Sequence, residues 1–562
     1  MANYSSLSRA QLSYDYLHTN STTHEFLFGA LAELVDNARD AAATQISINA
    51  VPNDSLRGGY MLGFLDDGEG MAPDEAADII TFGKSSKKSQ EANLIGMYGN
   101  GLKSGSMRIG NDFILFTKKG PSMTLVFLSR SFHEEEDIDE IVVPMPSFES
   151  TTKKPLAKSV KDKDRHKLEM DIILKYSPFK TEEELMKEFD RIEGNSGTLV
   201  IIYNMKLLDS GEPELDVKTE PHDIILSNPN TEGYDSDEGL MPERKSFRAY
   251  LSILYAEPRM KIYLKGKKVG TRRLASILYK PRSYKFSSNR FKTRSENEAR
   301  KAQEEHKAAD FKAREAESKY RDLENKMGSS QKRDQRAELR KAQTLANELR
   351  QEAQLKKQIA DRKVRSLKDP KSLNFIFGTN LENRSQDGLF FYNCNRLIKM
   401  YQKAGPQAEN GETCKGVLGI VDIPYLVLEP THNKQDFADA KEYRLLQRAM
   451  GEHLMQYWKD SGIPQQGVSA FWENFGYSSS NWRDPPSQDP KFVRKRAMQL
   501  PQCVQCNLCL KWRILPFSAN NIGKEFPEDW ICSSNPDPGH NRCSAAEQKM
   551  TIQEGVLKKE VK

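Results

Sequence analysis

Long apolar runs are missing from this 562-residue sequence. A helix that crosses a bilayer needs roughly eighteen or more consecutive apolar residues, and no such stretch occurs, so we expect no membrane span. The first twenty residues, MANYSSLSRAQLSYDYLHTN, also lack a charged start followed by an apolar core. Without such a leader, secretion is not expected.

Cysteine is scarce outside one short segment. The chain has seven cysteines, and five of them lie between Cys503 and Cys543. A disulfide framework would distribute its cysteines over an exported domain. The clustering therefore indicates a metal site in a reducing compartment.

A strong net charge is lacking as well, since 84 Lys and Arg face 79 Asp and Glu for a net of +5. Proline is absent between Pro281 and Pro370, where Ala, Glu, Lys, Arg and Gln dominate. Residues 292–369 hold 22 basic and 15 acidic residues, a local net charge of +7. This composition predicts two helices of roughly 35 residues that fold back at Gly328 into an antiparallel coiled-coil arm ~50 Å long.

Two interpretations of this arm remain open. Charge pairs at i,i+4 would suit a solvated spacer with no partner of its own. The basic excess instead favours an arm that contacts nucleic acid or a protein partner, because phosphates attract Lys and Arg without regard to sequence.

The chain before the arm has the pattern of a mixed α/β domain, which we place at residues 1–275. Helical periodicity runs from Phe26 to Ala41, while QISINAV, GYMLGFLDDG and GTLVIIYNM are typical of strands. The Pro-, Asn- and acid-rich stretch between Asp209 and Glu243 is expected to be a surface loop.

The α/β pattern resumes after the arm. The insertion, residues 290–369, therefore lies inside a second domain that we place at residues 276–490. The helical run DAKEYRLLQRAMGEHLMQYWKD is expected to close that domain, and a polar linker dotted with aromatic residues should follow. The cysteine cluster and its tail occupy residues 491–562. The fold class expected is α/β multidomain.

Two segments of the first domain carry candidate nucleotide-binding residues. ELVDNARDA places Glu33 and Asn37 on one helix face, where a carboxylate can accept a proton from water and an amide oxygen can ligate Mg²⁺. In FLDDGEGM, ionised Asp66 could accept the exocyclic amine proton of adenine, and Gly68 and Gly70 allow a close backbone approach. Taken singly, each segment is more simply explained as a polar helix face or as an ordinary Asp-Gly turn.

A third segment, GMYGNGLKSGS, lacks the lysine of a P-loop, because Leu102 stands in its place. The G-x-G-x-x-G pattern fails too, since Ser104 replaces the last glycine. The preceding KSSKKSQEAN is also unsuited to a buried strand. Backbone N–H groups at a helix start can attract anions without a Walker lysine, so a phosphate lid that ends in Gly96, Gly99 and Gly101 is expected.

The order of these motifs, followed by SGT before a strand, resembles the GHKL superfamily of gyrase, Hsp90, MutL and histidine kinases. The resemblance implies a Bergerat fold in which a mobile lid covers ATP, with Glu33 as general base and Asn37 as Mg²⁺ ligand. It implies that Asp66, supported by Thr198, reads adenine. It also implies that a lysine of the next domain reaches the γ-phosphate, and EPTHNKQDF supplies Lys434, which is otherwise a surface loop lysine. The other nucleotide contacts that it implies are Gly68, Gly70, Ser85, Lys87, Gly96, Gly99, Asn100, Gly101, Leu102 and Lys103.

Four thiolates with one C-x2-C pair suit a tetrahedral zinc site. Cys503 also forms a C-x2-C pair with Cys506, so the sequence leaves two registers open. VQCNLCLKWRILP and WICSSNPDP resemble the CW-type zinc finger, which implies that the Zn²⁺ ligands are Cys506, Cys509, Cys532 and Cys543. Trp512 matches one of the two tryptophans of a methyl-lysine cage, but Cys503 stands at the other, so weak or absent binding of methyl-lysine histone tails is expected.

The combination of these three parts resembles the microrchidia family. That resemblance implies a nuclear ATPase that forms a homodimer through its ATPase domain when ATP binds. It implies binding to double-stranded DNA, largely independent of sequence, contact with chromatin silencing proteins, and a role in chromatin compaction and transcriptional silencing. A chromatin scaffold that binds nucleotide with little turnover is the alternative. A histidine kinase is disfavoured, because neither a phospho-acceptor histidine helix nor a receiver domain is evident.

Overall fold

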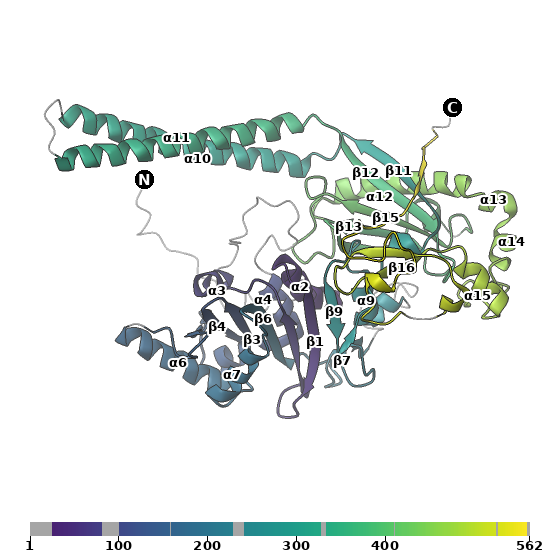
Figure 1. Cartoon of the computed structure of the whole chain (residues 1–562), viewed down its shortest axis with the longest axis horizontal. Coiled ribbons are helices and arrows are strands. Elements are labelled where there is room, and N and C mark those ends of the chain that lie inside the picture. The colour runs from purple at the N-terminus through teal and green to yellow at the C-terminus, as the bar shows by residue number, and fades with distance from the viewer. Residues whose placement is uncertain are drawn as a thin grey trace.

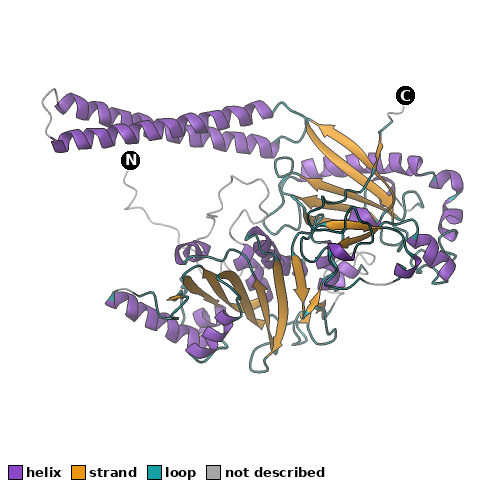
Figure 2. Cartoon of the chain, in the orientation of Figure 1, coloured by secondary structure: helices purple, strands orange, loops and turns teal. Residues whose placement is uncertain are grey.

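A computed structural model describes residues 25–80, 101–157, 159–228, 241–327, 333–409, 411–523 and 526–558. Figure 1 shows two α/β units side by side, with an arm of two long helices that projects from the second unit. Figure 2 shows that both units are built around sheets with helices packed against them. The α/β multidomain class expected from the sequence is confirmed.

The first unit is built on an eight-stranded sheet in which only the β1–β9 pair is parallel among its described strands. The three strands predicted here from sequence are confirmed as β1, β2 and β6. In spatial order the strands are β10 (Lys267–Lys268), β9 (Lys261–Leu264), β1 (Gln45–Pro52), β2 (Tyr60–Asp66), β6 (Ser196–Met205), β3 (Gly110–Lys119), β4 (Ser122–Ser129) and β5 (Ser147–Glu149).

Both faces of this sheet are buried, because its central strands alternate between two cores. In β3, Phe113 and Leu115 belong to one core, whereas Ile114 and Phe116 belong to the other, as the two-residue period of a strand requires. Helices line both faces, namely α2 (Leu27–Asp40), α3 (Pro73–Ile80), α4 (Gly101–Ile109), α5 (Arg130–Glu135), α6 (Val160–Tyr176), α7 (Glu182–Asp190), α8 (Pro242–Lys245) and α9 (Phe247–Ile253).

Helix α2 lies at the centre of the molecule. It begins and ends within one residue of its predicted bounds, and its buried side chains join a core that continues into the second unit through Phe390 and Tyr392. The stretch from Asp209 to Glu243, predicted to be a surface loop, contains the short pair β7 (Leu215–Asp216) and β8 (Ile225–Leu226). Residues 229–240 of that stretch lie outside the described residues.

The second unit is a six-stranded mixed sheet covered by helix α12 (Ala440–Ser461), which confirms the helix predicted to close this domain. In spatial order its strands are β14 (Arg396–Gln402), β13 (Gly388–Asn393), β15 (Val417–Ile423), β12 (Lys371–Thr379), β11 (Tyr279–Ser288) and β18 (Gln553–Gly555). The last of these follows the cysteine cluster in the chain and pairs parallel to β11.

The arm consists of two antiparallel helices inserted between β11 and β12, as the sequence predicts. Helix α10 spans Thr293–Met327 with 35 residues, and α11 spans Arg333–Ser366 with 34. The turn expected at Gly328 lies outside the described residues. Small side chains fill the seam, namely Ala299, Ala302, Ala309, Ala313, Ala316, Ala346, Ala353 and Ala360.

The expected linker after α12 is wrong as a description of residues 463–489. Four aromatic residues of this segment are buried and extend the second core, namely Phe471, Trp472, Phe475 and Tyr477. Burial of large aromatic side chains is favourable even when their sequence neighbours are polar. Short helices carry this segment, namely α13 (Ile463–Gln466) and α14 (Val468–Glu473), with α15 (Pro490–Ala497) following.

The cysteine-rich unit contains the two-stranded sheet of β16 (Gln502–Gln505) and β17 (Trp512–Leu515). The described chain also contains short 3-10 helices, namely η2 (Leu274–Ile277), η3 (Gly405–Ala408), η4 (Ala519–Asn521) and η5 (Cys532–Ser534). Within the described ranges, every helix is too short or too polar to cross a membrane.

Candidate nucleotide site and zinc centre

Helix α2 carries two carboxylates on its buried face. Glu33 and Asp36 are 2% and 0% exposed in a helix whose other buried residues are apolar or glycine. Burial of an ionised carboxylate is costly unless cations and hydrogen bonds compensate it. The helix is therefore built around a charged site and not only around a core.

Lys434 supplies the nearest cation and comes from the second unit. Its Nζ lies 2.8 Å from Glu33 Oε2 and 3.0 Å from Asp36 Oδ2. The lysine sits at φ 53° in a tight turn whose flanks are joined by the Pro430–Phe437 bridge. Strained left-handed backbone at a non-glycine residue is retained where the surroundings fix it, and here it directs the ammonium toward α2.

The turn that carries Lys434 is also attached to the start of α2. Gln435 Oε1 accepts from the Phe26 backbone N–H at 3.1 Å, and Gln435 Nε2 donates to the Phe26 carbonyl oxygen at 2.9 Å. A Cβ on Gly29 would lie 2.6 Å from Gln435 Nε2, so a larger residue there would displace the Gln435 side chain from its hydrogen bonds with Phe26. This turn thus holds α2 at its start through Gln435 and at Glu33 and Asp36 through Lys434.

The two carboxylates have opposite pKa shifts. Burial raises the pKa of Glu33 above its usual range, and the attraction of Lys434 only partly opposes it. Burial also acts to raise the pKa of Asp36, but Arg396 and Lys434 outweigh it and hold that pKa below its usual range. Glu33 Oε1 is buried and has no hydrogen-bond partner among the described residues. Within the part of the chain that the structure describes, Glu33 Oε1 is therefore unpaired, and the Glu33 pKa is raised.

Asp66 ends β2, and the backbone N–H groups of Gly68 and Thr198 donate to its carboxylate, the first at 2.9 Å. Burial nevertheless raises the pKa of Asp66 to about 6. The neighbouring Asp67 has a different task, since it accepts from the backbone N–H groups of Thr44 and Gln45 at the start of β1. Asp67 thus holds the start of β1, whereas Asp66 accepts hydrogen bonds at the end of β2.

Glycines shape the walls of this site. Gly70 has φ 62°, and a Cβ there would lie 1.8 Å from the Lys118 carbonyl oxygen. Gly101 begins α4 beside Glu33, since a Cβ there would lie 2.3 Å from Glu33 Oε2. Substitution at either glycine would require displaced backbone or a displaced carboxylate.

The remaining predicted nucleotide contacts divide into two groups. Leu102 is half-buried and Lys103 is buried in the first turn of α4, where burial lowers the pKa of Lys103 to about 8. Asn37 is half-buried on α2, next to Asp36. The others predicted to bind phosphate, Ser85, Lys87, Gly96, Gly99 and Asn100, lie outside the described residues.

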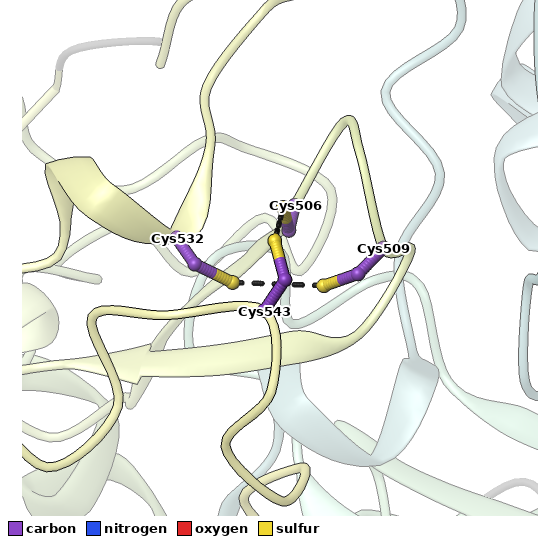
Figure 3. Close-up of side chains that lie close together, drawn as sticks. All are labelled: Cys506, Cys509, Cys532 and Cys543. Atoms are coloured by element: carbon purple, nitrogen blue, oxygen red, sulfur yellow. Dashed lines mark hydrogen bonds between the residues drawn. The ribbon is translucent and has the colours of Figure 1, made fainter.

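Four cysteines meet in the C-terminal unit, as Figure 3 shows. The sulfur atoms of Cys506, Cys509, Cys532 and Cys543 all lie within 4.8 Å of one another. The Cys506–Cys543 and Cys509–Cys532 sulfur pairs are 3.8 Å and 3.6 Å apart. Tetrahedral zinc with bonds of about 2.3 Å separates its sulfur ligands by about 3.8 Å, so the donor set and spacing fit Zn²⁺.

Cys503 lies outside this group. It sits on β16 opposite Ile514, where burial raises the pKa of its thiol. The structure therefore supports the register in which Cys506 is the first ligand. Arg513 is fully buried behind the site and its Nε lies 3.3 Å from Cys532 Sγ, which orients and stabilises a thiolate there.

The cysteine-rich unit packs on the first α/β unit. Lys268 Nζ donates to Asn507 Oδ1 at 3.0 Å, and Gln505 Nε2 donates to the Pro258 carbonyl oxygen at 2.9 Å. Arg259 forms an ion pair with Glu547 at 2.8 Å. Trp512 is only 3% exposed at this contact. The cysteine-rich unit is thus held against the first unit by side-chain contacts.

Three residues of the charged site were not singled out from the sequence. Asp36 accepts hydrogen bonds from Arg396 Nε at 3.0 Å and from the Tyr255 hydroxyl at 2.8 Å. A signal for Asp36 does exist, since it lies three residues after Glu33 on the same helix face. Arg396 and Tyr255 lie far away in the sequence, and no local pattern marks them.

Comparisons with known proteins match each unit to a known family. The histidine kinase-, DNA gyrase B- and HSP90-like ATPase family matches residues 24–164, the Morc6 ribosomal protein S5 domain 2-like family matches 331–458, and the CW-type zinc finger matches 502–549. The chain is 60% identical to ATPase MORC2A of Mus musculus over 100% of its own length and 54% of that protein. It is 59% identical to ATPase MORC2 of Homo sapiens over 100% of its own length and 53% of that protein.

A more distant relative, MORC family CW-type zinc finger protein 1 of Mus musculus, is 45% identical over 99% of this chain and 56% of that protein. The chain therefore spans about half the length of the curated relatives that it matches. The similarity extends across both α/β units, the arm and the cysteine-rich unit.

Proposed function

The chain belongs to the microrchidia family, and we propose that its two α/β units form an Mg²⁺-dependent ATPase whose site is completed by Lys434. One observation carries this proposal: Lys434 of the second unit reaches across to Glu33 on α2, with 2.8 Å between Nζ and Oε2. A cation that enters the site from another unit can stabilise charge on a terminal phosphate and respond to its loss.

The residues divide the chemistry between them. Glu33 has a raised pKa and an Oε1 with no partner among the described residues, so it can take a proton from the attacking water. When ATP is bound, Lys434 would donate its hydrogen bond to the γ-phosphate in place of Glu33. Asp66 would accept a hydrogen bond from the adenine amine, with Thr198 beside it. Asn37 would ligate Mg²⁺, which neutralises phosphate charge when bound.

Coupling to the arm is supported by its attachment. Arg294, in the first turn of α10, forms an ion pair with Glu429 at 2.8 Å, and Ser295 Oγ donates to the Leu426 carbonyl oxygen at 2.9 Å. These partners lie just before Lys434 in the same loop. A shift of Lys434 toward phosphate would therefore move the loop that contacts the first turn of α10.

We propose on this basis an ATP-dependent homodimeric clamp that binds double-stranded DNA largely without sequence preference. Its action in the nucleus would be chromatin compaction and transcriptional silencing, together with silencing proteins. The name ATPase in its relatives and the basic excess of the arm support this assignment.

Turnover separates this proposal from a scaffold that binds ATP as a structural ligand. Glu33→Ala and Glu33→Gln should bind ATP yet lose nearly all hydrolysis, because each removes the carboxylate that would take the proton from water. Glu243→Gln is the matched control, since Glu243 is 3% exposed and accepts from the Tyr401 hydroxyl at 2.9 Å outside the site. Equal hydrolysis in Glu33→Ala and the parent would remove Glu33 from this role. ATP-dependent assembly without Glu33-dependent turnover would favour the scaffold.

Oligomeric state provides the second test. Light scattering with a non-hydrolysable ATP analogue should give a dimer, and mostly monomer without nucleotide. Lys434→Ala should weaken this switch, whereas Lys441→Ala, which removes an exposed lysine nearby, should not. A dimer of equal strength in both conditions would contradict the clamp.

A further inference from the structure

Asp36 accepts more hydrogen bonds than Glu33 in the charged site, although the proposed ATPase chemistry gives it no role. It is fully buried, and three groups from separate parts of the chain donate to it. These are Lys434 Nζ at 3.0 Å, Arg396 Nε at 3.0 Å and the Tyr255 hydroxyl at 2.8 Å. A carboxylate buried to this degree persists only because its partners are arranged to satisfy it.

The charges around Asp36 balance as a group of four. Glu33 and Asp36 are acidic, Lys434 and Arg396 are basic, and all four are at most 4% exposed. Arg396 contacts Asp36 and, at 3.2 Å, the Tyr250 hydroxyl. Arg396 therefore fixes the position of Asp36 by an ion pair. Lys434 forms ion pairs with both Asp36 and Glu33.

We propose that Asp36 is a positioning residue for Lys434, held in place by Arg396, and that it keeps the lysine from pairing with Glu33 alone. This rests on the proposed ATPase function of the same site. With Asp36 present, Lys434 engages only Oε2 of Glu33, and Oε1 remains without a partner among the described residues. The free oxygen is the one that can serve as base.

Loss of Asp36 changes what Lys434 can do. The ammonium then has Glu33 as its only carboxylate partner in the group of four, and a tighter pair lowers the basicity of Glu33 and delays transfer of Lys434 to phosphate. Arg396 stays near α2 but loses its counterion. The effect should fall on the chemical step, because neither Asp36 nor Arg396 belongs to the adenine end of the site around Asp66.

The test uses the full chain with Asp36→Asn and with the double substitution Asp36→Asn/Arg396→Met. The single variant leaves the buried Arg396 without a counterion and can fail to fold, whereas the double variant removes one charge of each sign and keeps the group neutral. In the folded variant, kcat should fall by about tenfold or more, as for a displaced catalytic group, and the Kd for ATP should stay within about threefold of the parent.

The matched control is Asp112→Asn. Asp112 is 1% exposed on β3 and accepts from Ser129 Oγ at 2.7 Å and Ser131 Oγ at 2.7 Å, outside the site. Its loss should alter thermal stability without a selective loss of kcat. An unchanged kcat in the Asp36 variants overturns the proposal, and so does a loss found entirely in the Kd for ATP.

A second measurement does not depend on turnover. The rate at which an amine-reactive label modifies Lys434 in the nucleotide-free chain, read by mass spectrometry, should rise at least about threefold in the Asp36 variants, because one of two anchors is gone. The Asp112→Asn protein should label like the parent. If the parent lacks Glu33-dependent hydrolysis, the proposed function fails, and the labelling rate alone then decides the role of Asp36. Equal labelling in parent and variants overturns that role.

Discussion

The guanidinium of Arg273 lies over the indole ring of Trp512, 5.2 Å from its centroid. The same arginine forms ion pairs with Glu257 and Glu547, so it is fixed in this position from both sides. A cation over an aromatic face is the interaction by which methyl-lysine cages work. In this chain the face of Trp512 is therefore already used by a residue of the chain itself.

The first prediction concerns this aromatic face. The full chain should show no preference for trimethylated over unmodified histone tail peptides in calorimetric titration. Arg273 covers one wall of a cage, and Cys503 stands where the second tryptophan would be, so the cation would lose contacts of about 0.5–2 kcal/mol each. Arg273→Ala/Cys503→Trp should gain the preference if this register holds. Clear preference in the parent would mean that another residue completes the cage.

The second prediction concerns the metal. Cys506→Ser and Cys543→Ser should each lose zinc, measured as zinc atoms per chain, because structural sites depend on all four thiolates. Binding of structural zinc is worth about 10–16 kcal/mol in small fingers, so residues 502–549 should then become open to proteolysis. Cys503→Ser is the control and should keep its zinc. A zinc-free Cys503→Ser protein would put Cys503 among the ligands.

The third prediction follows from the raised pKa of Asp66. The folded pKa of about 6 lies above the ordinary 3.8, so ionised Asp66 destabilises the nucleotide-free protein above pH 6, and this penalty disappears as pH falls toward 4. Asp66→Asn should therefore raise the free energy of unfolding at pH 8 by on the order of 2 kcal/mol while it abolishes ATP binding. Thermal denaturation at pH 8 and pH 5 should show the gain shrinking at the lower pH. A destabilised variant at pH 8 would contradict the burial of this carboxylate.

The fourth prediction concerns the arm. Substitution of four basic residues of α11 by Glu, at Arg333, Arg336, Arg340 and Lys341, changes the local charge of residues 292–369 from +7 to −1. DNA affinity should fall alike on unrelated duplexes, and the dependence of log K on log salt should flatten, because fewer phosphate counterions are released.

The matched control reverses four exposed basic residues of α6, Lys161, Lys163, Arg165 and Lys167, which changes the net charge of the chain equally. The salt slope of this control should stay close to that of the parent. An unchanged slope in the α11 variant would leave the arm as a spacer or a protein-docking surface.

Local patterns in the sequence were sufficient for much of the fold. Strands β1, β2 and β6, helix α2 and the two arm helices follow from periodicity and composition, because each of these signals lies within one continuous segment. Glu33 and Asp66 lie on elements of this kind. The structure therefore has Glu33 on the predicted helix and Asp66 at the end of the predicted strand.

Contacts between distant segments were beyond such reasoning. Arg396 and Asp36 are separated by 360 positions, and a buried ion pair of this kind leaves no periodic trace. The polar composition after α12 predicts a linker, yet Phe471 and Trp472 of this segment extend a core. Packing of the cysteine-rich unit on Lys268 depends on the whole fold in the same way.

Strand β18 gives the second sheet its outer boundary. It returns after the zinc centre and pairs with Arg282, Ser283 and Tyr284 of β11, where Gly555 lies against the Tyr284 ring so closely that a Cβ would come within 2.3 Å of it. A chain cut before Gln553 would expose the N–H and C=O groups of β11 as an open sheet edge, and such edges recruit other chains. Shortened forms of this protein should therefore aggregate through that edge, even with an intact nucleotide site.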